Sequence, residues 1–248
     1  MEMIENNLIR QHVILAFLLL LISSCKKEER IPNINFNPSV TYGSMTDQDG
    51  NVYKTVIIGA QIWIAENLKT TRYRNGELIH YVTDNTQWKN LASGAYCNYN
   101  NDDKNKNVYG YLYNWYAVND IRNLAPQGWH VPSDAEWTTL YSFLGGEDVA
   151  GFKLKESGID HWNDPNSDAN NESGFTALPG GLRGNITFFG TSFGYGYSYL
   201  GRDGIWWSCS TDSTSTYAGY RILDYYLSKG DKGYSGKDYG YSVRLVKD

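Results

Sequence analysis

The first residues that could support catalysis are a histidine and an acid within residues 128–137. His130 lies six positions before Glu136, and imidazole and carboxylate groups are common partners in acid–base chemistry. Ser133 and Glu136, however, have the three-residue spacing of a capping box, which predicts that a helix begins here. A single histidine between Trp129 and a valine is more often a buried, hydrogen-bonded core residue. We therefore interpret His130 as structural.

A second group of polar residues lies in the loop around residue 160. Asp160, His161 and Asp164 are close in sequence, but adjacency in a polar loop does not make a catalytic site. The triplet Trp-Asn-Asp at 162–164 resembles the one whose oxygens bind Ca²⁺ and sugar hydroxyls in C-type lectins. The acid-Pro-Asn motif that accompanies it in lectins is missing just upstream. We therefore expect a turn here, not a calcium site.

Metal-binding and cysteine patterns are sparse. Asp102 and Asp103 could supply oxygen ligands to Ca²⁺, but their spacing matches no EF-hand and a solvated turn is favoured. The sequence has no Cys-x-x-Cys and no Cys/His cluster, so it predicts no zinc site and no cofactor. Cys97 and Cys209 could pair in an oxidising compartment or remain free thiols, and their sequence separation does not decide between the two.

Composition and charge exclude several functional classes. The formal net charge is −5, and no basic cluster is interleaved with aromatic residues, so nucleic-acid binding is not expected. No Gly-x-Ser-x-Gly nucleophile motif is present, and we expect no enzymatic activity. The chain holds 21 Tyr, 8 Trp and 25 Gly. Because Tyr and Trp combine a large apolar body with a polar tip, this composition favours a loop-rich extracellular domain with a binding surface.

The N-terminal region predicts a lipid-anchored protein. Residues 1–24 are interpreted as a signal peptide, because residues 13–22 form an apolar run too short to span a bilayer. Small residues before Cys25 resemble a bacterial lipobox, so Cys25 is the expected site of lipidation (a palmitate-type acyl anchor). The charged run at 26–30 resembles a surface-export signal of outer-membrane lipoproteins. Residues 25–45 are expected to form the lipidated cysteine and a flexible tether.

Beyond the tether, residues 46–248 predict a single domain with helices between strand-rich ends. The dipeptide Asp49-Gly50 predicts a turn in an opening hairpin at 46–70. Helices are expected at 109–119, 133–144 and 148–156. Short strands are expected at 175–178, 205–208, 217–226 and 241–246, with an ordered loop and edge strand at 188–199. This order indicates an α+β fold and not repeated βαβ units.

Several motifs in order carry a family resemblance. They are the runs at 62–68 (Ile-Trp-Ile-Ala-Glu-Asn-Leu), 109–115 (Tyr-Gly-Tyr-Leu-Tyr-Asn-Trp), 128–137, 174–181 (Gly-Phe-Thr-Ala-Leu-Pro-Gly-Gly), 206–208 (Trp-Trp-Ser) and 241–244 (Tyr-Ser-Val-Arg). Over residues 46–248 the chain closely resembles the Fibrobacter succinogenes major paralogous domain. The resemblance implies a C-type-lectin-like fold related to formylglycine-generating enzymes, on a secreted or lipid-anchored bacterial protein, without a shared catalytic activity.

The sequence departs from this family at two positions. Relatives usually carry a cysteine before the Pro-x-Gly-Trp-His run and another in the final strand, where this chain has Ala125 and Leu245. The resemblance therefore implies that packing replaces a disulfide, which would forgo about 2–4 kcal/mol of stability. It also argues against Cys97 and Cys209 as an inherited bridge.

The function expected from the sequence is non-catalytic binding at the outer-membrane surface, of a glycan or a protein partner. Tyrosines and tryptophans of the Gly/Tyr-rich C-terminal half are the candidate binding residues, namely Tyr195, Tyr197, Tyr199, Trp206 and Tyr217. Because adjacent strand residues point to opposite faces, Trp206 or Trp207 is expected to be structural. The alternatives are a structural or adhesive surface protein and an enzyme related to the formylglycine-generating enzymes.

Overall fold

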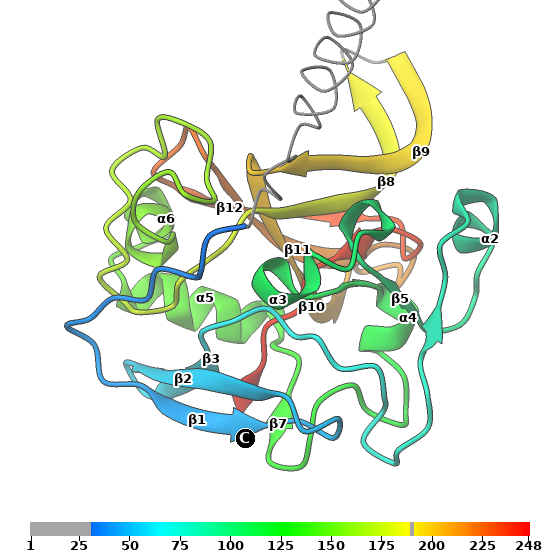
Figure 1. Cartoon of the computed structure of the whole chain (residues 1–248), viewed down its shortest axis with the longest axis horizontal. Helices are drawn as coiled ribbons and strands as arrows, with labels where there is room; N and C mark the ends of the chain where they lie inside the picture. The colour runs from blue at the N-terminus through cyan, green and yellow to red at the C-terminus, as the bar shows by residue number, and fades with distance from the viewer. Residues whose placement is uncertain (1–30, 189–190) are drawn as a thin grey trace, which may run out of the picture. The chain divides into compact units, whose positions relative to one another are not determined.

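The computed structural model describes residues 31–188 and 191–248, and these residues form a mixed α+β domain (Figure 1). The predicted signal peptide, the predicted lipidation site Cys25 and the charged run at 26–30 lie outside the described residues. Within the described part of the chain, no helix has the length and apolar character needed to cross a membrane. The compact unit runs from Pro32 to Asp248.

A five-stranded sheet contains both the first and the last strand of this unit. Its order is β1-β2-β3-β14-β7, with every neighbouring pair antiparallel. The strands are β1 (Gly43–Thr46), β2 (Val52–Ile58), β3 (Gln61–Ile64), β14 (Val246–Lys247) and β7 (Trp129–His130). The predicted turn is confirmed, since Gly50 adopts a positive φ of 82° between β1 and β2. The last strand therefore lies between the opening hairpin and β7.

The tether ends earlier than the sequence indicated. The backbone NH of Asn35 donates to Glu156 at 2.6 Å, and Val40 and Tyr42 pack against the hydrophobic core. Residues 43–46 form β1 itself. The prediction of a flexible spacer up to residue 45 is therefore wrong for this part, because its few apolar side chains find partners on the domain.

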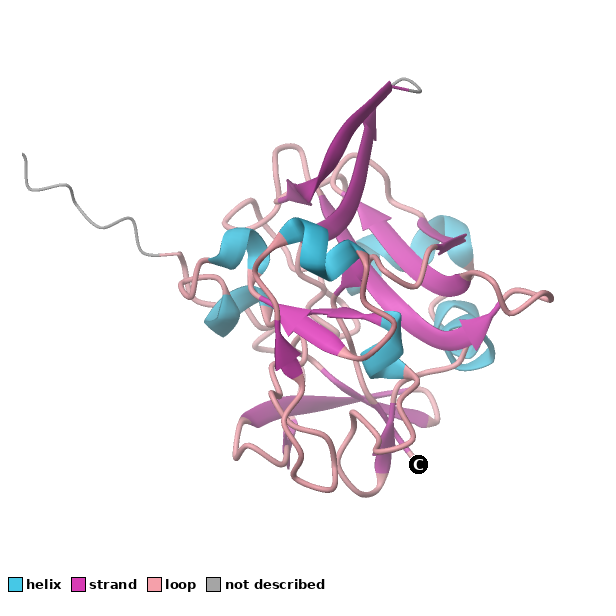
Figure 2. Ribbon diagram, turned by 90° about the vertical axis from the view of Figure 1, so that its right-hand side faces the viewer, coloured by secondary structure: helices cyan, strands magenta, loops and turns pink. Residues whose placement is uncertain are grey.

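A six-stranded sheet has the order β4-β5-β6-β13-β8-β9. Its strands are β4 (His80–Tyr81), β5 (Ala95–Cys97), β6 (Leu112–Asn114), β13 (Gly240–Tyr241), β8 (Gly180–Phe188) and β9 (Thr191–Leu200). The predicted edge strand is confirmed as β9, which pairs only with β8 in this order. The far end of the β8–β9 hairpin projects away from the other strands (Figures 1 and 2).

A third sheet has three antiparallel strands in the order β10-β11-β12. They are β10 (Asp203–Thr211), β11 (Ala218–Asp224) and β12 (Gly230–Ser235). The strand expected at 205–208 is confirmed as part of β10, and the one expected at 217–226 is confirmed with the shorter bounds of β11. The strand expected at 175–178 is not formed, because that segment makes only an isolated bridge from Ala177 to Lys155. The one expected at 241–246 divides into β13 and β14, which belong to different sheets.

The helices are short. They are α2 (Asn85–Lys89), the 3₁₀ turn η1 (Tyr99–Asn101), α3 (Lys106–Tyr109), α4 (Trp115–Val118), α5 (Asp134–Phe143) and α6 (Glu147–Leu154). The capping box at the start of α5 is confirmed, since the Ser133 NH donates to Glu136 at 2.8 Å and the Glu136 NH donates to the Ser133 hydroxyl at 3.3 Å. The single helix expected at 109–119 is wrong. That segment contains the end of α3, strand β6 and α4.

Three hydrophobic clusters fill the spaces between these elements. One is centred on Trp207 and Tyr113, a second on Trp63, Trp137 and their neighbours, and a third, smaller one on Trp88. The rings of Trp63 and Trp137 lie 4.8 Å apart. Because α5 carries Trp137 onto the β3 side of the core, the helix that follows the capping box is fixed by aromatic packing.

Candidate functional site: a tyrosine stripe beside a polar pocket

Residues from several of the sequence motifs contact one another in the interior. The Asn67 carboxamide oxygen accepts hydrogen bonds from Trp206 Nε1 and Arg244 Nε, both at 2.8 Å. Its amide nitrogen donates to the carbonyl of Tyr109 at 2.9 Å. Asn67 thus joins four motifs that are far apart in sequence. We call this group the buried hub.

Arg244 is the charged centre of the buried hub. Its guanidinium is fully buried, donates to the carbonyls of Ile64, Phe175 and Thr176, and lies 4.5 Å from the Phe175 ring. Burial lowers the pKa of Arg244 to about 9. Since backbone carbonyls and the Asn67 oxygen satisfy its donors, this arginine binds the fold together and is not available to a ligand.

Trp206 does not lie on a binding surface. Its side chain is buried, and the same is true of Trp207. Trp206 belongs to the second hydrophobic cluster and Trp207 to the first, so β10 lies between two packed regions and both of its faces are covered. The assignment of Trp206 to the binding residues is therefore wrong.

His130 is hydrogen-bonded, as expected, but it is not buried. Its side chain is 36% exposed, and its ring nitrogens contact Glu136 at 2.7 Å and Asp248 at 2.6 Å. Burial alone would lower the pKa of His130, but the hydrogen bonds that the ring donates to the Asp248 and Glu136 carboxylates outweigh it and raise this pKa. Because each ring nitrogen already faces a carboxylate oxygen, neither nitrogen is free to take a proton from a ligand.

His161 is also fixed by hydrogen bonds. It is buried, with Nδ1 2.7 Å from Glu156 and Nε2 3.0 Å from the carbonyl of Pro32. Burial opposes the charged form, yet the hydrogen bond that the ring donates to the Glu156 carboxylate raises the pKa of His161. The nearby Trp162 is buried and donates to the Ala177 carbonyl at 2.9 Å. The His161 loop therefore holds the start of the domain and the core together.

The remaining acids and cysteines show no assembled site. Asp102 accepts from the backbone NH of Lys104, and Asp103 accepts from Asn98, as in a local turn. Cys97 and Cys209 are free thiols. Among the described residues, no group of three or more His, Cys, Asp or Glu side chains is arranged to hold a metal ion.

The surface that gathers aromatic side chains lies on β4, on β5 and at the residue immediately before β6. Tyr81 and Tyr96 are register partners, and so are Tyr96 and Tyr113, so these side chains share one face of the sheet. Ring centroids are 5.2 Å apart for Tyr81 and Tyr96, and 4.7 Å apart for Tyr96 and Tyr111. Tyr113 is fully buried, whereas Tyr81 is 45% exposed. Tyr81, Tyr96 and Tyr111 form the tyrosine stripe.

The hydroxyls of the tyrosine stripe are largely unused by the protein. No hydrogen bond within residues 31–188 and 191–248 involves the hydroxyl of Tyr96 or Tyr111, while that of Tyr81 accepts one from Asn98 at 3.3 Å. Burial, followed by the charges of neighbouring tyrosines and acids, raises the pKa of Tyr96 to about 12. These hydroxyls therefore stay protonated near neutral pH and can both donate and accept hydrogen bonds.

A cavity adjoins the Tyr111 end of the stripe. Its volume is about 240 Å³, and it is lined by Tyr111 and by side chains from the β1–β2 turn, the segment after β3 and α3. The other lining residues are Asp49, Asn51, Lys69, Thr71, Lys106 and Asn107. We call this cavity the polar pocket.

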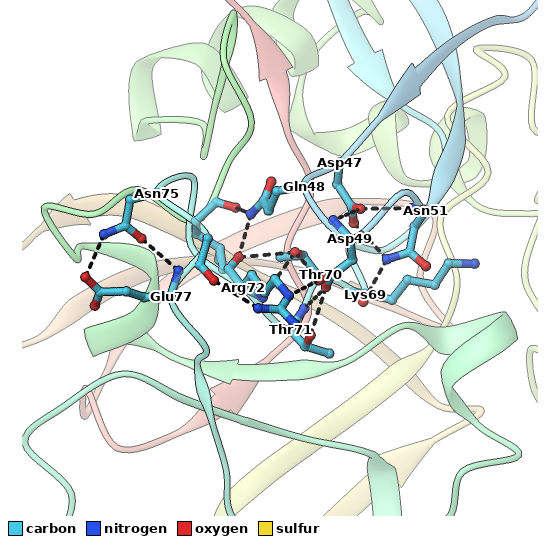
Figure 3. A network of polar contacts seen from close by, with 12 residues as sticks. Asp47, Gln48, Asp49, Asn51, Lys69, Thr70, Thr71, Arg72, Asn75 and Glu77 are labelled. Atoms are coloured by element: carbon cyan, nitrogen blue, oxygen red, sulfur yellow. Dashed lines mark hydrogen bonds and ion pairs between the residues drawn. The ribbon is translucent and has the colours of Figure 1, made fainter.

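Hydrogen bonds fix the wall of the polar pocket (Figure 3). Asp47 accepts from the backbone NH of Asp49 and from the backbone and side chain of Asn51, all at 2.9 Å. Asp49 accepts from the NH and hydroxyl of Thr71 and forms an ion pair with Arg72 at 3.1 Å. This network locks the β1–β2 turn onto residues 69–72, so the pocket is preorganised.

The tyrosines that the sequence placed on a binding face lie mainly on β9. Tyr195 donates its hydroxyl to the carbonyl of Asp238 at 2.5 Å, and Tyr197 donates to Asn101 at 2.7 Å. Tyr199 packs against the first hydrophobic cluster. Tyr195 and Tyr197 therefore form a row against the third hydrophobic cluster, with their hydroxyls committed to the protein, and Tyr199 lies apart from them.

Tyr217 stands apart from this row. It is 51% exposed and immediately precedes β11 in the three-stranded sheet, where its NH donates to Asp212 at 3.0 Å. The five residues predicted from the sequence therefore do not form one surface.

Two further cavities, of about 300 and 290 Å³, border residues 119–121. The second is lined by His130 and Cys209 among others. Burial, with the charge of Glu136 adding to it, raises the pKa of the Cys209 thiol. The thiol is therefore protonated near neutral pH, and this cavity lacks the thiolate that nucleophilic chemistry requires.

Comparison with protein families accounts for the motifs of the buried hub. The family described as the Fibrobacter succinogenes major domain matches residues 56–247. The chain belongs to this family. Among curated proteins and among solved structures, no significant match to the chain was found. The Fibrobacter succinogenes major domain of this chain thus contains the motif residues Asn67, Trp206 and Arg244 as internal contacts.

The sequence around Tyr111 indicates both a strand and a helix. Tyr111 and Tyr113 alternate with the period of a strand, but the apolar residues from Leu112 to Val118 also fit a helix. Tyr81 and Tyr96 lie in segments without a clear period. Their pairing with β6 depends on chain folding and could not be read locally.

Proposed function

We propose that this Fibrobacter succinogenes major domain is a non-catalytic glycan-binding module whose contact surface is the tyrosine stripe. The observation that carries the proposal is the combination of three adjacent, partly exposed rings with a preorganised polar pocket at one end. The candidate surface is therefore on β4, on β5 and immediately before β6, and not on β9.

The chemistry of the surface suits a carbohydrate. A sugar ring has apolar C–H faces and a rim of hydroxyls, and tyrosine offers an apolar face with a polar tip. Tyr96 and Tyr111 supply hydroxyls without protein partners, and Asn51 and Asn107 add groups at the pocket. Few convergent polar groups beside an apolar surface are the usual composition of a small-molecule site.

The proposal includes the cellular context expected from the sequence. Cys25 would carry the lipid anchor, and the domain would face outward from the outer membrane, where it meets polysaccharides. A C-type-lectin-like arrangement is part of the same proposal. It is supported by the mixture of short helices with small antiparallel sheets and by the family membership.

The test is a glycan-array and calorimetric survey of the purified full chain. We expect binding to at least one glycan class, and we expect the Tyr81→Ala/Tyr96→Ala double variant to lose it. The Tyr226→Ala variant is the matched control, because Tyr226 is 64% exposed and lies outside the stripe. Near-UV circular dichroism and the thermal midpoint show whether each variant is folded.

Two results would contradict the proposal. One is the absence of binding to any glycan by the folded wild type. The other is a loss of binding on Tyr195→Ala or Tyr217→Ala, with binding retained in the stripe variant. Turnover of a bound glycan would contradict the non-catalytic part of the proposal.

An adhesive role is favoured by a separate observation. The β8–β9 hairpin projects from the domain, and Phe193 near its end is 69% exposed (Figure 2). An exposed aromatic residue on a projecting hairpin can anchor a protein partner. Co-purification of a surface protein that is lost on Phe193→Ser, without any glycan binding, would favour this function over the first.

A further inference from the structure

We propose that the polar pocket selects glycans that carry a negatively charged group, a carboxylate or a sulfate, on the sugar seated beside Tyr111. This inference rests on the proposed function of the tyrosine stripe and specifies its ligand. The observation behind it is the balance of charge in the pocket, which has one acid and two lysines among its lining residues.

The single acid among the lining residues is neutralised, and the acid behind it, Asp47, is buried and accepts from Asn51 and Tyr53. One carboxylate oxygen of Asp49 pairs with Arg72 at 3.1 Å, and the other accepts from Thr70 at 3.2 Å and from the NH and hydroxyl of Thr71. Asp49 is therefore supplied with donors by the protein. It neither needs a cation from the pocket nor cancels the charge of the two lysines.

The two lysines have no acidic partner in the described part of the chain. Lys69 and Lys106 are both half-buried, and no ion pair is formed by either. Figure 3 shows the Lys69 side chain extending beyond the hydrogen-bond network, with no dashed line to its ammonium group. Its Nζ lies 5.7 Å from the centre of the Tyr53 ring. Two unpaired ammonium groups on one small cavity favour an anion there.

The remaining lining residues define how that anion would be presented. Asn51 and Asn107 can bond ring hydroxyls, and Tyr111 connects the pocket to the rest of the stripe. A volume of about 240 Å³ is below the range of drug-sized sites and suits a single sugar residue. The adjoining sugars would then lie over Tyr96 and Tyr81.

The opposite end of the stripe has the opposite charge. Asn98 donates to the hydroxyl of Tyr81 at 3.3 Å and to the carboxylate of Asp103 at 2.5 Å. A neutral sugar is favoured beside Asp103, since an acidic one would be repelled. An acidic sugar is therefore favoured beside Lys69 and Lys106 over the position beside Asp103.

The experiment compares charged glycans with neutral forms of the same ring. Hexagalacturonate is paired with its full methyl ester, and a carrageenan hexasaccharide with its desulfated form. Isothermal titration calorimetry with the purified full chain measures each affinity at low salt and at high salt. We expect one anionic probe to bind about five- to tenfold more tightly than its neutral form, with the difference shrinking at high salt.

Charge variants identify the residues responsible. Lys69→Gln/Lys106→Gln should remove the preference while leaving affinity for the neutral probe within about twofold. Lys69→Glu should reverse the preference. Lys247→Gln is the control, because Lys247 is exposed on β14 and is not a lining residue.

The outcomes separate this inference from the proposed function. Equal affinity for charged and neutral probes, or a preference that survives both lysine variants, would overturn the inference and leave glycan binding intact. Binding of none of the four probes or of any other glycan would overturn both. The preferred anionic probe identifies the group as a carboxylate or a sulfate.

Discussion

The six-stranded sheet carries two rows of tyrosines at its two ends, and the rows face opposite sides. Asn114 pairs with Gly240, which pairs with Arg183, which in turn pairs with Tyr197. Because paired residues share a face and sequence neighbours alternate, Tyr197 lies on the face opposite Tyr113 and the tyrosine stripe. The same residue type thus appears twice on one sheet in different surroundings.

The difference between the rows lies in what the protein places behind the rings. On the β9 side, Arg183 is fully buried, lies 4.4 Å from the Trp88 ring and 5.0 Å from the Tyr197 ring, and donates to the carbonyls of Val82 and Thr83. These tyrosines cover a buried cation that holds α2 in place. The rings of Tyr96 and Tyr111 instead pack against the first hydrophobic cluster, and their hydroxyls, which have no partner among the described residues, remain available.

The largest expected effect comes from removing the buried cation. Arg183→Met leaves the carbonyls of Val82 and Thr83 without donors and should cost about 3 kcal/mol of unfolding free energy. Urea denaturation measures this loss, and Arg202→Met, at an exposed arginine, should cost about 0.5 kcal/mol. Glycan affinity of the native fraction should stay within about twofold. An unchanged urea midpoint would show that the β9 row is not structural.

Truncation of the most exposed ring of the stripe should affect binding and not stability. Tyr81→Ala should weaken glycan binding about tenfold, which corresponds to about 1.4 kcal/mol, and should change the unfolding free energy by about 0.5 kcal/mol. Tyr234→Ala removes a ring that is 57% exposed on β12 and should leave affinity unchanged. Calorimetry and denaturation together measure both. Equal losses of affinity in Tyr81→Ala and Tyr234→Ala would show that the stripe is not the glycan-binding surface.

Removal of one tyrosine hydroxyl should affect stability differently in the two rows. Tyr195→Phe removes a hydrogen bond to the Asp238 carbonyl and should cost about 1 kcal/mol of stability. Tyr96→Phe removes a hydroxyl without a protein partner and should cost about 0.2 kcal/mol or less while lowering glycan affinity. Thermal and urea unfolding measure the pair of variants in parallel. The comparison fails if Tyr96→Phe is the more destabilising of the two.

The smallest expected effect concerns His130, which belongs to neither row. Its raised pKa means that the protonated ring stabilises the fold below the unfolded value of about 6.5, and that this contribution is lost as pH rises through the folded pKa. Because the side chain is 36% exposed, we expect only about 0.5 kcal/mol. His130→Gln should lower the thermal midpoint more at pH 5 than at pH 9, with glycan affinity unchanged. A larger loss at pH 9 would contradict this assignment.

Local chemistry accounts for the elements that were predicted correctly. The Ser133–Glu136 capping box and the Gly50 turn depend on neighbouring residues, so their spacing alone indicates them. The helix predicted at 109–119 is not formed. Tyr111 and Tyr113 follow a strand period, while the flanking apolar residues fit a helix. The pairing of β6 with β5 and β13 decides between the two.

The candidate site was harder to predict than the fold. Trp206 looked like a surface aromatic, yet β10 has a hydrophobic cluster on each side and both of its tryptophans are buried. Tyr195 and Tyr197 were expected to be available, but they cover Arg183. Exposure of an aromatic side chain depends on which strands pack against it, and composition does not contain that information.

The sequence alone determined the family, the α+β class, the opening hairpin and the start of α5, because these depend on motifs and short-range spacing. The tertiary structure alone decided which tyrosines remain available. Tyr81 lies on β4, Tyr96 on β5 and Tyr111 immediately before β6, and the polar pocket beside them joins the β1–β2 turn to α3. Contacts between segments far apart in the chain create this surface, and the same kind of contact buries Asn67, Trp206 and Arg244 in the hub.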